Sequence, residues 1–171
     1  MTKKLKSVFA GLCLVLAGVA NAQTNDVVDV AKGSKDHTTL VTAIKAADLV
    51  TTLKGKGPFT VFAPSNNAFN KLPKGTIETL LKPASKAALV KLLTYHVVAG
   101  NLKAADIVAA IKVGKGKAVI KTLQGENLTA TLVKGKVILT DAKGDKATVT
   151  ATDLTASNGV IHVVNAVLMP R

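Results

Sequence analysis

Three histidines, His37, His96 and His162, are the side chains of this sequence best suited to acid–base or metal chemistry. No two of them have the H-x-x-x-H spacing that holds a zinc ion on one helix. His162 has apolar neighbours on both sides, which predicts a buried, hydrogen-bonded side chain rather than a ligand. His37 stands near an expected helix start, where we expect it to be solvated. The single cysteine excludes a cysteine-based zinc site. We therefore predict no metal ion and no cofactor.

Other patterns that carry catalysis or nucleotide binding are missing from the sequence. It contains no G-x-S-x-G elbow of a serine hydrolase, no P-loop and no dinucleotide-binding fingerprint. The 10 acidic residues are scattered and form no evident acid–base pair. The sequence therefore predicts a protein that is not an enzyme. A hydrolase whose groups converge only in space is the open alternative.

Tyr95 and His96 are adjacent side chains that combine an apolar ring with a polar tip. They follow an expected amphipathic helix over 86–94, which Ser85 is placed to cap. A buried imidazole normally finds a hydrogen-bond partner. One expectation is therefore that His96 bonds the turn at Ser65 and Asn66 and fastens this helix to the preceding strand.

The elements that position these residues change in type along the chain. Residues 26–31 and 40–47 have helical periodicity, and Asp36 is a candidate cap for the second segment. A Gly-Pro turn then opens an expected strand over 57–63, after which Ser65 is expected to cap a short helix.

Strand signals dominate the second half. Alternating apolar residues on both sides of a turn at 134–135 predict a hairpin, and a second pair over 147–154 and 160–169 is divided by Ser157-Asn158-Gly159. Helices and strands do not alternate regularly. The predicted class is therefore α+β, one domain with about five to seven strands and several helices.

Two segments predict strands that are buried on both faces. Phe59 and Phe62 are three residues apart in a strand and so point to opposite sides. Pro64 is expected to end that strand, with Phe69 of the next helix returning to the core. In the second segment, which begins at Val160, the side chains of Val160 and His162 point to one face of the strand and that of Ile161 to the other. We predict that the two segments are adjacent central strands.

These segments resemble the signature blocks of the fasciclin (FAS1) family. The first block is Gly57-Pro-Phe-Thr-Val-Phe-Ala-Pro-Ser-Asn-Asn-Ala-Phe69, and the second is Asn158-Gly159-Val-Ile-His162-Val-Val-Asn165. Between them Tyr95-His96 stands where that family has a Tyr-His motif. The resemblance covers about 25–169. It implies helices packed on a β-wedge and a role in adhesion, and it implies Tyr95 and His96 as binding residues.

The first 22 residues predict a cleaved export signal. Three lysines precede an apolar stretch from Val8 to Val19, and Ala20-Asn21-Ala22 fits the site that signal peptidase recognises. Cleavage after Ala22 leaves a domain over 23–171 without a transmembrane segment. We expect this domain to be secreted or periplasmic.

Charge indicates the kind of partner. The chain has 23 basic and 10 acidic residues, a formal net charge of +13, and 48% hydrophobic residues. Lysines recur beside glycine at expected turns, at 54–56, 115–117, 134–136 and 143–144. They either keep the surface soluble or attract an anionic partner. Nucleic acid is disfavoured, because the chain is expected to be exported and has few aromatic residues to stack on bases.

We therefore expect a secreted or periplasmic, non-enzymatic fasciclin-type module for cell adhesion or contact with an extracellular surface. Its expected partner is a protein or a polysaccharide. Two alternatives stay open, namely a carrier that holds an apolar small molecule between helix and wedge, and a binder of envelope polyanions.

Overall fold

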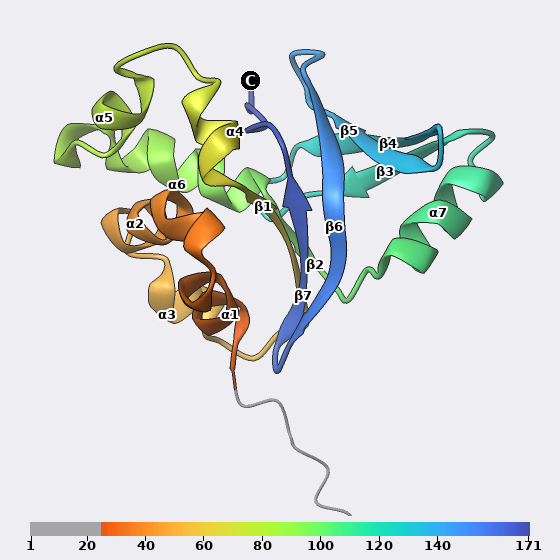
Figure 1. Cartoon of the computed structure of the whole chain (residues 1–171), viewed down its shortest axis with the longest axis horizontal. Helices are drawn as coiled ribbons and strands as arrows, with labels where there is room; N and C mark the ends of the chain where they lie inside the picture. The colour runs from red at the N-terminus through yellow and green to blue at the C-terminus, as the bar shows by residue number, and fades with distance from the viewer. Residues whose placement is uncertain (1–24) are drawn as a thin grey trace, which may run out of the picture.

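The computed structural model describes residues 25–171, so the expected export signal lies outside the described residues. A group of helices, mostly from the first half of the chain, packs against a strongly curved sheet that takes one strand from the first half and the others from the second (Figure 1). This arrangement confirms the predicted α+β class.

Seven α-helices are described, and most are short. They are α1 (Val27–Gly33), α2 (Thr38–Ala46), α3 (Val50–Leu53), α4 (Asn66–Asn70), α5 (Thr76–Leu80), α6 (Lys86–Tyr95) and α7 (Ala104–Val113). Single 3-10 turns cover Lys35–His37 and Pro83–Ser85.

Local hydrogen bonds explain where several helices begin. The Asp26 carboxylate accepts the backbone N–H groups of Val28 and Asp29 at the start of α1. As predicted, the Ser65 hydroxyl caps α4 by accepting the N–H of Ala68. The prediction for Asp36 was wrong, because this residue lies inside a 3-10 turn that the Ser34 hydroxyl caps. Ser85 precedes α6 but makes no side-chain capping bond.

Seven strands form one sheet in the order β2-β1-β7-β6-β5-β4-β3. Their bounds are β1 (Phe59–Pro64), β2 (Val97–Ala99), β3 (Lys117–Lys121), β4 (Asn127–Val133), β5 (Lys136–Thr140), β6 (Lys146–Ala156) and β7 (Gly159–Val164). β1 and β7 are parallel, and the other paired strands are antiparallel. The sheet nearly closes on itself, because Leu123 donates its N–H to the Val97 carbonyl at 2.7 Å.

Two hydrophobic cores lie on opposite faces of the central strands. The first packs helices α1, α2, α4 and α6 against Val61, Ala63 and Ile161. The second fills the inside of the curved sheet and includes Phe62 and Val164. The predicted burial of both faces of these strands is therefore confirmed.

The end of the chain departs from the predicted strand over 160–169. β7 stops at Val164, and the side-chain oxygen of Asn165 accepts the N–H of Thr148 at 2.9 Å. Beyond it, Leu168 and Met169 donate their N–H groups to the side chains of His96 and Asp141. These bonds to side chains replace the backbone hydrogen bonds that a longer strand would make with its neighbour.

Candidate functional site

The two signature segments lie side by side as interior strands of the sheet, second and third in its order. Phe59 on β1 pairs with Gly159 on β7, and the parallel register continues to Phe62 beside His162 and Pro64 beside Val164. Adjacency was predicted from apolar pattern alone and is confirmed. Backbone contact is close where the two strands start, since a Cβ on Gly159 would overlap the Phe59 carbonyl, and one on Gly57 would overlap the Asn158 carbonyl.

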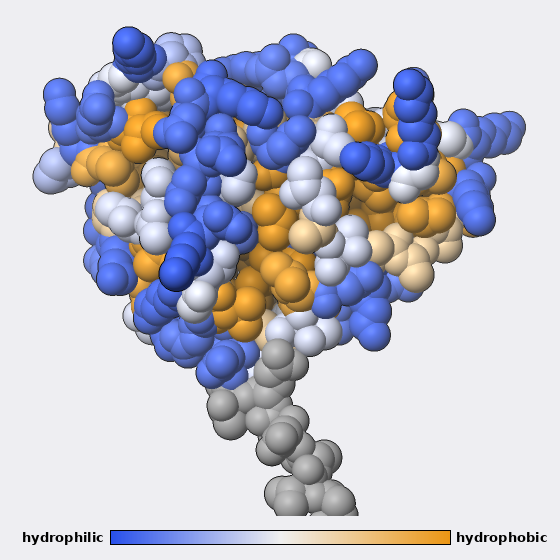
Figure 2. All heavy atoms as spheres, in the orientation of Figure 1, coloured by the Kyte–Doolittle hydropathy of each residue, from blue (hydrophilic) through white to orange (hydrophobic). Residues whose placement is uncertain are grey.

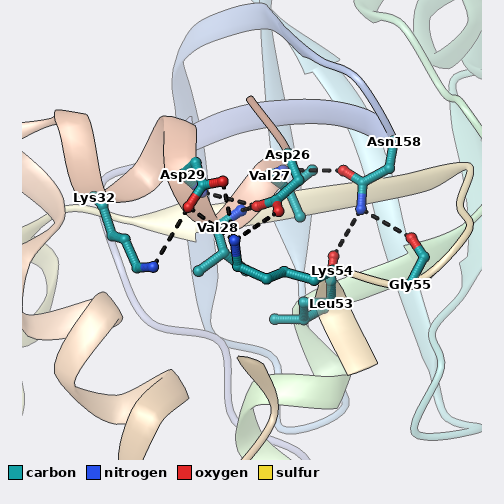
Figure 3. A network of polar contacts seen from close by, with 9 residues as sticks. All are labelled: Asp26, Val27, Val28, Asp29, Lys32, Leu53, Lys54, Gly55 and Asn158. Carbon is teal, nitrogen blue, oxygen red and sulfur yellow. Dashed lines mark hydrogen bonds and ion pairs between the residues drawn. The ribbon is translucent and has the colours of Figure 1, made fainter. Parts of the chain in front are cut away.

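Asn158 fastens three segments at this start (Figure 3). Its side-chain nitrogen donates to the carbonyls of Leu53 at 2.8 Å and Gly55 at 3.1 Å. Its side-chain oxygen accepts the N–H of Val27 at 3.0 Å. The amide thus holds the first turn of α1 and the end of α3 against the β6–β7 turn, a structural role for this signature residue.

An exposed ion-pair group lies beside Asn158. The Lys54 ammonium is 3.0 Å from carboxylate oxygens of both Asp26 and Asp29, and Lys32 is 3.4 Å from Asp29 (Figure 3). The hydrogen bond from Lys54 lowers the pKa of Asp29, and the bonds to Asp26 and Asp29 raise the pKa of Lys54. Lys54 is therefore paired within the protein, unlike the free cation expected at a Lys-Gly turn.

His162 is buried and hydrogen-bonded on both sides, as predicted. Its Nε2 donates to the Leu102 carbonyl at 2.7 Å, and its Nδ1 accepts the N–H of Asp153 at 3.3 Å. Asp153 sits in a register shift of β6, and its carboxylate accepts the N–H of Ala104 at the start of α7. His162 therefore joins β7 to an irregular part of β6 and to the loop before α7.

His96 is buried and fastens the end of the chain. Its Nδ1 donates to the Leu92 carbonyl at 2.9 Å, and its Nε2 accepts the N–H of Leu168 at 3.0 Å. The expected bond to the turn at Ser65 and Asn66 was wrong, because Asn66 instead bonds Thr39 and Lys35. Burial lowers the pKa of His96 to about 4, which keeps the imidazole neutral at pH 7.

Tyr95 points into the second core and is fully buried. Its hydroxyl accepts the N–H of Ala142 at 3.0 Å and donates to the Asn127 carbonyl at 3.3 Å. Burial raises the pKa of the phenol. The ring therefore connects α6 to β4 and to the β5–β6 turn, and it presents no polar tip at the surface.

His37 corrects another expectation. It was expected to be solvated, but it is 4% exposed, and its Nδ1 lies 2.8 Å from the Ser34 hydroxyl. The 3-10 turn over Lys35–His37 directs the ring inward, and burial lowers its pKa.

Within residues 25–171 no three His, Cys, Asp or Glu side chains could hold a metal ion together. Sequence reasoning missed Asp141, whose buried carboxylate accepts N–H groups of Lys143, Asp145 and Met169. The local Asp-x-Lys-Gly-Asp turn could have suggested the first two bonds, whereas no sequence signal points to Met169.

Among residues 25–171, the lysines whose ammonium group has a partner all precede residue 92, and they are Lys32, Lys54, Lys71, Lys86 and Lys91. Of the described lysines after residue 104, none makes an ion pair or a side-chain hydrogen bond. Positive charge without a partner is therefore concentrated around α7 and the strands β3–β6.

A cleft of about 460 Å³ lies between α1 with the turn after it and residues of β1, β6 and β7. Its apolar lining includes Val30, Ala31, Ala63, Leu154 and Ile161. Figure 2 shows hydrophobic surface between the helices and these strands. No helix among residues 25–171 is long and apolar enough to cross a membrane.

Known proteins match nearly all of the described chain. The family model for the Fasciclin domain matches residues 35–170. Protein sll1483 of Synechocystis is 47% identical over 156 residues, which cover 91% of this chain and 79% of the relative. The immunogenic protein MPT70 of Mycobacterium tuberculosis is 33% identical over 159 residues, 90% of this chain and 74% of the relative.

A solved structure shares the fold. It is a FAS1 domain pair from the insect cell adhesion molecule fasciclin I, with a TM-score of 0.75 and 16% sequence identity. The match covers 85% of this chain and about half (51%) of the solved chain. The near-closed seven-stranded sheet and its helices are therefore an arrangement already known from that pair.

Proposed function

The chain belongs to the fasciclin domain family, and from that premise we propose that it is a non-catalytic binding module that attaches to an extracellular surface. The observation that carries the proposal is the burial of Tyr95, His96 and His162, each hydrogen-bonded to the backbone. Side chains held in this way stabilise the fold and are not available to a substrate. Binding would then use the outer surface, where the unpaired lysines lie.

The cell adhesion molecule that shares the fold supports this proposal. The partner of the present chain would be a protein or a polysaccharide on a cell or in an extracellular matrix. In this proposal Tyr95 and His96 act indirectly, by supporting the strands and turns that meet the partner.

Export is part of the proposal. We expect cleavage after Ala22 and a mature domain over 23–171 in the periplasm or the medium. Intact-mass measurement of the recovered protein should give a chain that starts at Gln23. A recovered form that still carries Lys3, Lys4 and Lys6 would contradict cleavage.

Retention of cells on beads coated with the recovered protein tests attachment. The beads should retain the producing cells more strongly than beads coated with the same protein after heat unfolding. Equal retention on both would contradict a folded binding surface. Coated beads are then offered cell-wall fragments and membrane vesicles together. Retention of the fragments would indicate a polysaccharide partner, and retention of the vesicles would indicate a lipid partner.

The cleft beside α1 supports a second candidate function, the carrier of an apolar small molecule. Its apolar lining lies between helix and sheet, where a flat or linear molecule could be shielded from water. Native mass spectrometry of the recovered protein should then show added mass. Val30→Phe narrows the cleft, so the added mass should be absent from this variant. Protein without added mass in every preparation would contradict the carrier function.

A further inference from the structure

Two neighbouring turns form a basic end of the sheet, which we call the basic tip and define as residues 112–117 and 132–136. α7 ends at Val113, and the chain turns directly into β3. Because Lys117 on β3 pairs with Thr131 on β4, the turn before β3 and the turn after β4 project from the same end. Both turns lie at the right-hand end of the molecule in Figure 1.

Every residue of the basic tip is exposed. It carries five lysines, Lys112, Lys115, Lys117, Lys134 and Lys136, and the segments 107–125 and 127–140 contain no Asp or Glu. None of these five ammonium groups has an ion-pair or hydrogen-bond partner among the described residues. The tip therefore holds a cluster of positive charge that nothing in the described chain neutralises.

Apolar side chains are exposed among these lysines. Val113 is 86% exposed, Val133 50% and Leu132 38%, and Val119 on the adjoining outer face of β3 is 69% exposed. Of the six large hydrophobic residues that are exposed in the described chain, only Leu123 and Leu154 lie outside this group. Figure 2 shows projecting hydrophilic side chains around hydrophobic surface at this end. The lysines alone would keep these turns soluble. Solubility therefore does not explain why the valines among them are exposed.

We propose that the basic tip docks on an anionic lipid surface. Lysine ammonium groups would lie among headgroup phosphates while their alkyl chains and the valines enter the interfacial layer. A soluble polyanion would pair with the charges but would leave the valines in water. The combination of unpaired lysines and exposed valines therefore favours lipid. The inference goes beyond adhesion, because it holds or fails whether or not the protein binds cells.

Vesicle co-sedimentation tests the inference, using the recovered protein after mass measurement has shown that the leader is gone. Vesicles of phosphatidylglycerol and phosphatidylcholine should bind the protein in 0.1 M salt, and vesicles of phosphatidylcholine alone should not. Binding should weaken sharply at 1 M salt, because the Debye length falls from about 10 Å to about 3 Å.

Two variants separate charge from apolar insertion. In the first, Lys112→Gln, Lys117→Gln and Lys136→Gln are combined; Lys115 and Lys134 are kept because their φ angles of 54° and 50° are left-handed. Each lysine near an anionic membrane contributes about a fivefold factor, so partitioning should fall about a hundredfold. In the second, Val113→Thr with Val133→Thr keeps shape and charge and should lower partitioning by about tenfold.

The control is Lys45→Gln, Lys74→Gln and Lys82→Gln, three exposed lysines of the helical half with the same loss of charge. It should bind vesicles within about twofold of the wild type, since distant exposed charges are screened. Equal losses in the control and tip variants would overturn the inference, as would no vesicle binding at low salt. Strong binding to heparin together with an unchanged valine variant would assign the tip to soluble polyanions and reject lipid. Urea melts must show that each variant is folded.

Discussion

Phe62 and His162 are direct neighbours on the two central parallel strands, and their rings stack with centroids 5.6 Å apart. One residue comes from each signature segment, and 100 positions separate them in the sequence. Phe62 fills the second core, while His162 holds the β6 irregularity and the loop before α7 through its two ring nitrogens. The pair therefore connects apolar packing with the hydrogen bonds that shape the sheet.

Phe62→Ala should lower the free energy of unfolding by ~3–5 kcal/mol, because the vacated space lies in a closed core. That is a large part of the ~5–15 kcal/mol that stabilises a typical domain. Urea melts followed by circular dichroism measure the change. Val119→Ala is the control, since this side chain is mostly exposed and should change stability by less than ~0.5 kcal/mol. A loss below about 1 kcal/mol for Phe62→Ala would contradict the packing described here.

Gly159→Ala should destabilise the protein by ~1–3 kcal/mol or more, because the added methyl group overlaps the Phe59 carbonyl where β1 and β7 begin to pair. Gly33→Ala is a matched control at the end of α1, where a Cβ meets nothing within 4 Å. That change should be neutral or stabilising by up to ~1 kcal/mol. Thermal melts of both variants measure the difference, and equal effects would show that crowding at Gly159 is not the cause.

Pairing of β1 with β7 was predictable because the apolar pattern within each strand indicates its burial without reference to distant residues. Phe59, Phe62 and Ile161 belong to short apolar runs whose alternation indicates two buried faces. Ser65 was predictable for the same reason, because a helix cap lies next to the helix that it starts.

Partners of the buried histidines were not predictable from local pattern. His96 bonds Leu168, which is 72 residues away, and only the folded chain end brings that N–H to the ring. The prediction that His37 is solvated was wrong. A polar residue at a helix start is usually solvated, whereas a 3-10 turn here directs this ring into the protein. Exposure of the valines of the basic tip is likewise a property of the assembled sheet, since alternation alone does not say which face is covered.

His96 should make stability depend on pH between about 6.5 and about 4. Its pKa is near 6.5 when the chain is unfolded and about 4 in the folded protein. In this window the unfolded state binds a proton that the folded state does not, so stability is lost as the pH falls. The loss from pH 7 to pH 4.5 should be ~2–3 kcal/mol.

His96→Ala isolates this contribution from the carboxylates that also titrate. At pH 7 the variant should be less stable by ~1–3 kcal/mol, because the Leu168 N–H loses its acceptor. At pH 4.5 the gap should close, because only the wild type pays the cost of keeping the imidazole neutral. Urea melts at both pH values measure the gap, and a gap that does not change with pH would rule out titration of His96.

Tyr95→Phe distinguishes support of the fold from direct recognition. The change keeps the buried ring but removes the hydroxyl that bonds Ala142 and Asn127, so it should cost ~1–2 kcal/mol of stability. Retention of cells and binding to vesicles, measured per folded molecule, should stay at the wild-type level. The lysine variant of the basic tip should behave in the opposite way, with normal stability and weak vesicle binding. A Tyr95→Phe protein that is fully stable but no longer retains cells would instead make the hydroxyl a contact for the partner, reached only if the β5–β6 turn opens.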